Sequence, residues 1–215
     1  RVLFRSFLMD LIGNILEVAR IESGKETLTE TAWNLCNLED TLDLLLDRDI
    51  YKKQLTLKKN MELQHPKVYC DVLKVREITM NLLSNAVKYT PEGGTIHFTI
   101  RELPYERESY ALFQTVVEDT GIGISKEYIP HLFEAFTREK SSSESGIIGT
   151  GLGLRIVKNF VDLMEGSIVV ESEIGKGTRF TVTIPHRIAT ANEYISEENA
   201  KELSEEITLN NVRIL

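Results

Sequence analysis

The chain has 215 residues, of which 42% are hydrophobic and 27% charged, so it can bury a normal core and form one sizeable domain plus smaller attachments. Its formal net charge of −8 argues against a general nucleic-acid-binding surface, and we expect no nucleic-acid partner. No apolar run approaches the ~18 residues of a transmembrane helix, and two cysteines without metal-ligand spacing fit a reducing compartment. We therefore expect a cytoplasmic domain. The missing initiator Met indicates a fragment of a longer protein, whose membrane anchoring these residues leave open.

The first predicted element is an amphipathic helix over residues 3–22, which Ser23 and Gly24 end. Its apolar face is broad for a helix that packs on a single neighbour. We therefore interpret residues 1–24 as part of a bundle or hairpin whose partner lies outside this chain; a helix packed on its own domain is the alternative. Residues 25–30 are predicted to be a linker. The apolar face consists of Phe4, Phe7, Leu8, Leu11, Ile12, Ile15, Leu16, Val18 and Ala19.

Residues 31–188 interleave helical and strand patterns and are predicted to form the main domain. The strands at 95–101 and 111–118 flank a polar turn, which predicts a hairpin. A second hairpin is predicted for 167–173 and 178–184, with Gly175-Lys-Gly177 as its turn. The other predicted elements are a strand near Trp33, a helix over 38–51, strands over 55–59 and 67–70, a central helix capped by Asp71, a short helical region through Phe133 and Phe136, and a helix over 152–164.

The central helix has two chemically different faces. Glu77, Asn81, Asn85 and Lys88 follow one another at steps of four, four and three and form a polar stripe, while an apolar face can lie against a sheet. Two carboxamides one turn apart are neutral oxygen ligands for a hard cation that brings phosphates with it, and a lysine one turn further can reach phosphate. The stripe therefore favours a magnesium-nucleotide site. For the helix taken alone, a solvated polar face is the alternative.

Two glycine-rich segments lie downstream. Asp119 ends an apolar strand and is followed by Thr-Gly-Ile-Gly, which places a buried acceptor for an adenine amino group beside backbone that a ligand can approach closely. The segment 149–154, Gly-Thr-Gly-Leu-Gly-Leu, opens a helix whose free N–H groups could hold phosphate oxygens. Because it follows a loop and not a strand, neither a Rossmann fingerprint nor a Walker A loop applies. The polar run 138–146 before it predicts a mobile lid.

In this order and spacing, the Asn81/Asn85/Lys88 helix, the Asp119-x-Gly-x-Gly segment, the Phe133/Phe136 segment and the 149–153 glycines closely resemble the ATP-binding domain of bacterial sensor histidine kinases. The resemblance covers roughly residues 30–186. Residues 8–24 also resemble the second helix of this family's dimerisation and histidine-phosphotransfer hairpin. The implied fold is α+β, a two-layer α/β sandwich in which helices cover one face of a mixed sheet (the Bergerat-type ATP-binding fold), preceded by one amphipathic bundle helix.

The resemblance also implies roles for single residues. Asn85 would bind Mg²⁺ with the help of Asn81, Asp119 would accept a hydrogen bond from the adenine amino group, and Lys88 and Arg138 would contact phosphates. Asn81, Lys88 and Arg138 form the implied catalytic set. The other implied ATP contacts are Tyr89 beside the adenine, Gly121 and Gly123 making room for the base, Thr178 near the adenine through water, Gly149, Gly151, Leu152 and Gly153 around the phosphates, and Ile124, Thr150 and Leu154 in the same segments.

The implied function is transfer of the γ-phosphoryl group of ATP to a histidine in two-component signalling, with Mg²⁺ as cofactor. The phosphoacceptor should precede the second bundle helix, and the chain starts too late to contain it. None of the chain's own histidines has the acidic and Thr/Asn-Pro context of that acceptor: they are His65, His97, His131 and His186. The implied partners are therefore a phosphoacceptor His of the same or a partner protomer, a homodimeric full-length protein, and a response-regulator receiver domain.

Particular residues distinguish between the alternative functions of such a fold. Gyrase-, Hsp90- and MutL-like ATPases share the nucleotide fold and activate water with a Glu four residues before the magnesium Asn. That position is Asn81 here, which favours transfer to a bound acceptor over hydrolysis. A binding-only pseudokinase is disfavoured because no nucleotide motif is broken. For Phe133 and Phe136, anchoring of the lid and packing in the core both stay open.

Residues 189–215 turn acidic, with six glutamates between Glu193 and Glu206, and are predicted to be a linker. They end in the apolar run Asn211-Val-Arg-Ile-Leu215. This run either begins a receiver domain, which would make the parent a hybrid kinase, or is a simple apolar tail.

Overall fold

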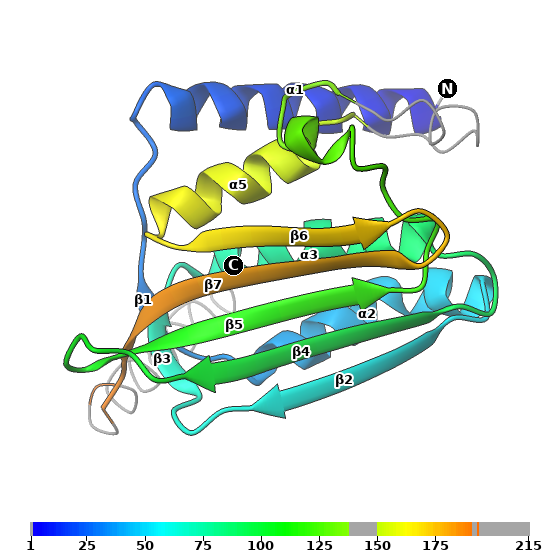
Figure 1. Cartoon of the computed structure of the whole chain (residues 1–215). Coiled ribbons are helices and arrows are strands. Elements are labelled where there is room, and N and C mark those ends of the chain that lie inside the picture. Colours follow the sequence, from blue (N-terminus) through cyan, green and yellow to red (C-terminus); the bar gives the residue numbers. More distant parts are fainter. Residues whose placement is uncertain (1, 138–149, 191–192, 194–215) are drawn as a thin grey trace, which may run out of the picture.

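The computed structural model describes residues 2–137, 150–190 and 193, and a seven-stranded mixed sheet forms its centre (Figure 1). The strand order is β1-β3-β7-β5-β4-β2, and β6 pairs with the first half of β7. In the described residues β2 runs parallel to β4 and all other pairings are antiparallel, so both predicted hairpins, β4–β5 and β6–β7, are confirmed. The strands are β1 (Thr31–Asn34), β2 (Thr56–Glu62), β3 (Lys67–Cys70), β4 (Thr95–Leu103), β5 (Tyr110–Asp119), β6 (Ser167–Glu173) and β7 (Gly177–Ile188).

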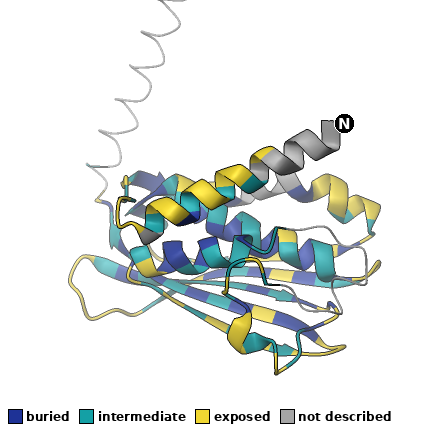
Figure 2. Ribbon diagram, turned by 90° about the horizontal axis from the view of Figure 1, so that it is seen from above, coloured by how far each residue is buried: buried dark blue, intermediate teal, exposed yellow. Residues whose placement is uncertain are grey.

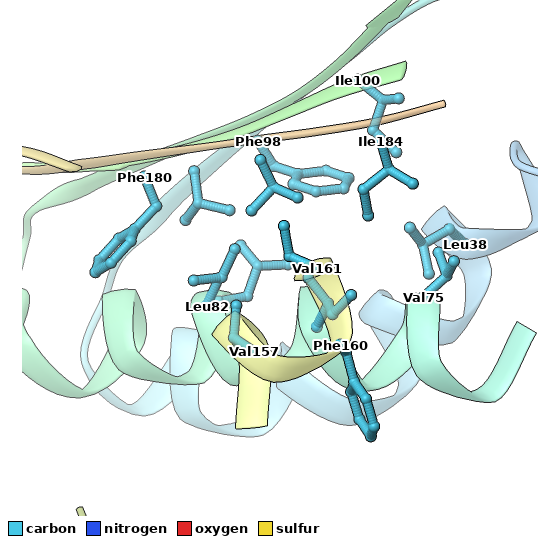
Figure 3. Close-up of a cluster of buried hydrophobic side chains, with 14 of the residues drawn as sticks. Leu38, Val75, Leu82, Phe98, Ile100, Val157, Phe160, Val161, Phe180 and Ile184 are labelled. Carbon is cyan, nitrogen blue, oxygen red and sulfur yellow. The ribbon is translucent and has the colours of Figure 1, made fainter. Parts of the chain in front are cut away.

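Three helices cover one face of this sheet, and the core lies between the two layers (Figure 3). They are α2 (Asn37–Lys52), α3 (Val72–Tyr89) and α5 (Gly153–Leu163). Strand β4 shows why the sheet has two unlike faces: Ile96, Phe98 and Ile100 alternate with the exposed His97 and Arg101. The predicted two-layer α+β fold, with helices on one face, is therefore confirmed.

Both ends of α3 are held by specific hydrogen bonds. Asp71 is the N-cap, and its Oδ1 accepts from the N–H of Lys74 at 3.2 Å, as the sequence predicted. At the other end, Lys53 donates from Nζ to the backbone oxygens of Val87 and Lys88 at 2.7 and 3.0 Å. The helix ends before Thr90, which is extended as expected for a residue before proline. These contacts fix the helix that carries the predicted polar stripe.

Helix α1 (Val2–Glu22) lies against α5, on the side of the helix layer away from the sheet (Figure 1). Val18 is buried, and Leu11 and Ile21 pack partly buried against the core. Its outward side carries exposed apolar residues, and Figure 2 colours much of the described part of α1 as exposed, so the helix packs on the rest of the chain with one side only. These exposed residues are Met9, Ile12, Ile15 and Leu16. Within the described residues, no helix is both long and apolar enough to span a membrane.

Some predicted bounds differ from the structure. The region through Phe133 and Phe136 is helical only as a 3-10 turn, η1 (Ile129–His131), and Phe136 has a positive φ of 63° that a continuing helix does not allow. Strand β7 runs four residues beyond its predicted end because Pro185–Arg187 pair with β5, and Arg187 and Ile188 pair with β3. The predicted lid at 138–146 and the terminal apolar run 211–215 lie outside the described residues.

Candidate functional site

The predicted site residues meet in one cavity of about 280 Å³, bounded by α3, α5, the segment after β5, and β7. Twelve residues of the predicted set line it: Asn81, Asn85, Lys88, Tyr89, Asp119, Gly123, Ile124, Thr150, Gly151, Gly153, Leu154 and Thr178. These residues come from segments spread over almost a hundred positions. The fold therefore brings the polar stripe, the Asp119 segment and the later glycines to one place.

The polar stripe of α3 forms one wall of this cavity. Asn81 donates from Nδ2 to the backbone oxygen of Glu77 at 3.0 Å, which holds its carboxamide on the helix surface. Its Oδ1 lies so close to Gly153 that a Cβ atom there would come within 2.5 Å of it. A side chain at this position would have to displace the Asn81 carboxamide, so glycine favours the close approach of α5 to α3. Glu77, the first residue of the stripe, is not among the cavity residues.

Asp119 is the buried acid of the site, with 7% of its surface exposed. Its Oδ1 accepts a hydrogen bond from the N–H of Gly121 at 2.7 Å, and the backbone of Thr178 donates to its carboxyl as well. Burial nevertheless raises the pKa of Asp119 to about 6, because these bonds only partly offset the desolvation of the charge. A further hydrogen-bond donor on the cavity side would therefore stabilise the ionised form of this carboxyl.

The glycines after Asp119 have different roles. Gly121 does not line the cavity, but a Cβ atom there would lie 2.5 Å from Oδ1 of Asp119 and 2.8 Å from the backbone oxygen of Tyr89. Gly123 has a φ of +72°, and its Cβ atom would meet the backbone oxygen of Glu173 at 2.1 Å. Glycine is thus required for close packing behind the cavity at both positions.

A small hydroxyl network holds the far wall. The hydroxyls of Ser172 and Thr178 lie 2.9 Å apart. Ser172 also accepts from the N–H of Ile124 at 2.8 Å and donates to the backbone oxygen of Gly177 at 2.9 Å. This network ties the segment after β5 to the β6–β7 hairpin, so Thr178 is held in place beside Asp119.

Four other predicted residues are not among those that line the cavity, and Gly121 is one of them. The side chain of Leu152 is 1% exposed and belongs to the core. Arg138 and Gly149 lie outside the described residues. Of the two aromatics, Phe133 packs partly buried against the core, whereas Phe136 is 61% exposed and its N–H donates to the backbone oxygen of Gly151 at 3.1 Å.

The cavity also contains residues that the sequence patterns did not indicate. Ser84 lies one turn from Asn81 on α3, so helical spacing could have found it. Tyr128 and Thr137 share a hydrogen bond of 3.2 Å at the cavity, and no local pattern pointed to it. Asn14 comes from α1, in another predicted segment, and also had no local signal. The remaining residues of this kind are Ala86, Ile122, Leu132 and Phe180.

Three relatives can be aligned with more than four fifths of this chain. The hybrid signal transduction histidine kinase B of Dictyostelium discoideum is 34% identical over 84% of the chain. The autoinducer 2 sensor kinase/phosphatase LuxQ of Vibrio vulnificus (strain YJ016) is 31% identical over 90%, and the sensor protein GacS of Pseudomonas syringae pv. syringae is 37% identical over 82%. The chain spans only 9%, 23% and 19% of the lengths of these three proteins.

Solved structures of similar fold agree with these relatives. Full-length ShkA in complex with AMPPNP matches with a TM-score of 0.71 and 26% identity, over 86% of this chain and 37% of that one. A nucleotide-free catalytic domain of histidine kinase ThkA matches with a TM-score of 0.61 and 25% identity, over 73% of this chain and 95% of that one. Residues 70–188, more than half of the chain, match the family model described as histidine kinase-, DNA gyrase B- and HSP90-like ATPase, so the chain belongs to this family.

Proposed function

We propose that this chain is the ATP-binding catalytic part of a sensor histidine kinase, which transfers the γ-phosphoryl group of ATP to a histidine outside these residues. The observation that carries the proposal is the single cavity, which combines a buried acceptor at Asp119, the carboxamides of Asn81 and Asn85, and glycine backbone at 151–153. The histidine kinases named above as relatives support this choice within the family.

The adenine of ATP would bind at the Asp119 end of the cavity. Its amino group would donate to the carboxyl of Asp119, which would lower the pKa of that carboxyl toward its ordinary value. Phe180 and Ile122 supply apolar surface for the base in the same wall, and Thr178 is positioned there by Ser172. Specificity for adenine would therefore come from one charged acceptor in an apolar setting.

The phosphates would bind at the opposite end, between α3 and the start of α5. Lys88 supplies a positive charge, and backbone N–H groups near Gly151 and Gly153 supply donors. Within the described residues there is no cluster of acidic or histidine ligands for a metal ion. The residues present fit Mg²⁺ that arrives with the nucleotide, since Asn85 and Asn81 would add neutral oxygens to a shell of phosphates and water.

A kinase role is favoured over ATP hydrolysis by the position of the nearest acid of α3. The carboxyl of Glu77 makes a hydrogen bond with Glu17 of α1, and Glu77 is not among the residues that line the cavity. Asn81, which does line it, cannot accept a proton from water. Positioning and charge neutralisation are then what the site offers, as transfer to a bound acceptor requires.

The acceptor and the other partners belong to the rest of the protein. We propose a phosphoacceptor His on the same or a partner protomer and a homodimeric parent, for which the exposed apolar side of α1 is a suitable bundle face. A response-regulator receiver domain would take the phosphate, on a separate protein or on the same polypeptide after residue 215. The parent would be a phosphoprotein of bacterial two-component signalling, with this part in the cytoplasm.

Calorimetry and a labelling assay test the proposal together. The 215-residue chain should bind ATP and ADP only when Mg²⁺ is present, and it should not label itself with γ-labelled ATP. Binding that does not depend on magnesium, or stoichiometric labelling of this chain, would contradict the assignment. The full-length protein should acquire an acid-labile label, as phosphohistidine does, whereas an acid-stable label would indicate a hydroxyl acceptor.

A further inference from the structure

One residue that lines the proposed nucleotide cavity comes from α1 and not from the predicted catalytic domain. Asn14 of α1 is a lining residue, together with Asn81, Asn85 and Lys88 of α3. In the part of the chain that the structure describes, the carboxamide of Asn14 makes no hydrogen bond. Asn14 is half-buried and lines the cavity from α1, so the NH₂ donor and the carbonyl acceptor of its side chain are available to a ligand.

The docking of α1 explains why Asn14 faces inward. Leu11, Val18 and Ile21 pack against the core, and Asn14 lies three residues after the first and four before the second. It therefore belongs to the same inward stripe of the helix. Just beyond the end of α1, Glu26 forms an ion pair of 2.8 Å with Lys74 of α3. The inward face of α1 thus makes apolar contacts on both sides of Asn14, and an ion pair lies beyond the end of the helix.

A second contact shows which end of the cavity Asn14 reaches. The carboxyl of Glu17 makes a hydrogen bond with that of Glu77, so these two positions of α1 and α3 lie opposite each other. Asn14 is one turn before Glu17, and Asn81 is one turn after Glu77. Because both asparagines line the same cavity, the two helices run antiparallel here and Asn14 lies on the Asn81 side. This is the end at which the proposed phosphates and metal would bind.

We propose that Asn14 is a further nucleotide ligand, whose Nδ2 donates a hydrogen bond to the terminal phosphoryl group of bound ATP. The inference rests on the proposed function and extends the site beyond the catalytic domain to the preceding helix. The triphosphate site is then complete only while α1 is docked on α5. By thermodynamic linkage, a ligand with a γ-phosphate stabilises the docked position of α1, and a ligand without one does so less.

The test compares AMPPNP with ADP, because the two differ in the group that Asn14 would contact. Affinities of the 215-residue chain are measured by calorimetry with Mg²⁺ for the unmodified chain and for Asn14→Ala. We expect the affinity for AMPPNP to fall about tenfold and that for ADP to change by less than about twofold, as for the loss of one hydrogen bond to a charged group. Leu16→Ala, on the exposed side of the same helix, is the matched control and should change neither affinity.

Two further measurements separate direct contact from an effect on folding. Asn14→Asp, which adds a negative charge beside the phosphate, should weaken AMPPNP binding more than Asn14→Ala does. Hydrogen exchange of α1 should slow with AMPPNP more than with ADP, and this difference should vanish in Asn14→Ala. Unchanged AMPPNP affinity, or an equal loss for both nucleotides, would overturn the inference. If the unmodified chain bound neither nucleotide, the proposed function itself would fail instead.

Discussion

Replacing Asp119 with Asn should weaken nucleotide binding while making the folded chain more stable at alkaline pH. In the structure, one carboxyl oxygen is held by the N–H of Gly121 at 2.7 Å. An asparagine that keeps this bond with its carbonyl oxygen turns its NH₂ group toward the adenine amino group, so that two donors meet. A mismatch of this kind in a buried site costs about 1–3 kcal/mol, which is an affinity loss of roughly fivefold to 150-fold.

The effect on stability has the opposite sign. The pKa of Asp119 is raised from its ordinary value of 3.8 to about 6, mainly by burial. The folded chain therefore holds a proton that the unfolded chain releases between about pH 4 and pH 6, and stability decreases as the pH rises through this window. The Asn variant has no such loss, so its free energy of unfolding at pH 8 should exceed that of the unmodified chain by about 1–3 kcal/mol. Near pH 3.5 both side chains are neutral and the two stabilities should be similar.

Urea unfolding at pH 3.5 and pH 8, together with calorimetry of Mg·ADP binding, measures both effects on the same protein. Lower affinity with equal or higher stability at pH 8 supports the assignment of Asp119 to the adenine. Unchanged affinity would refute that assignment. Loss of affinity that accompanies a comparable loss of stability at both pH values would show that the residue acts only through folding.

Two other predictions concern the contact between α1 and α3 and the turn after β5. The pKa of Glu77 is raised to about 7, first by burial and then by Glu17, so the native chain loses stability as the pH rises from about 4.5 to 7. The variant Glu77→Gln should therefore be more stable than the unmodified chain by about 1–2 kcal/mol at pH 8, after discounting for partial exposure, and no more stable at pH 4. Unfolding curves that show the same difference at both pH values would contradict this. Gly123→Ala should destabilise the chain by more than about 3 kcal/mol, because it adds a clash with the backbone oxygen of Glu173 to the cost of a positive φ. The control is Gly175→Ala, where φ is a similar +77° but a Cβ atom would have no neighbour within 4 Å. This variant should lose only about 1 kcal/mol of stability in thermal unfolding. Equal losses of stability in the two variants would show that the clash at Gly123 is relieved.

Patterns among neighbouring residues determine much of this fold. The alternation in β4 and the helical spacing in α3 reflect which side of each element faces the core, and this is written into the local sequence. Asp71 is predictable as a cap because its side chain acts within its own first turn. The same holds for Asn81 and Asn85, since residues four apart on a helix must share a face.

What the sequence alone could not determine involves contacts between distant segments. The strand order, and the pairing of Arg187 and Ile188 with β3, depend on how segments more than a hundred residues apart meet. By its sequence, Asn14 is one more polar residue of a predicted bundle helix. Only the packing of α1 on α5, through apolar residues whose partners no local pattern identifies, brings Asn14 to the cavity that Asn81 also lines.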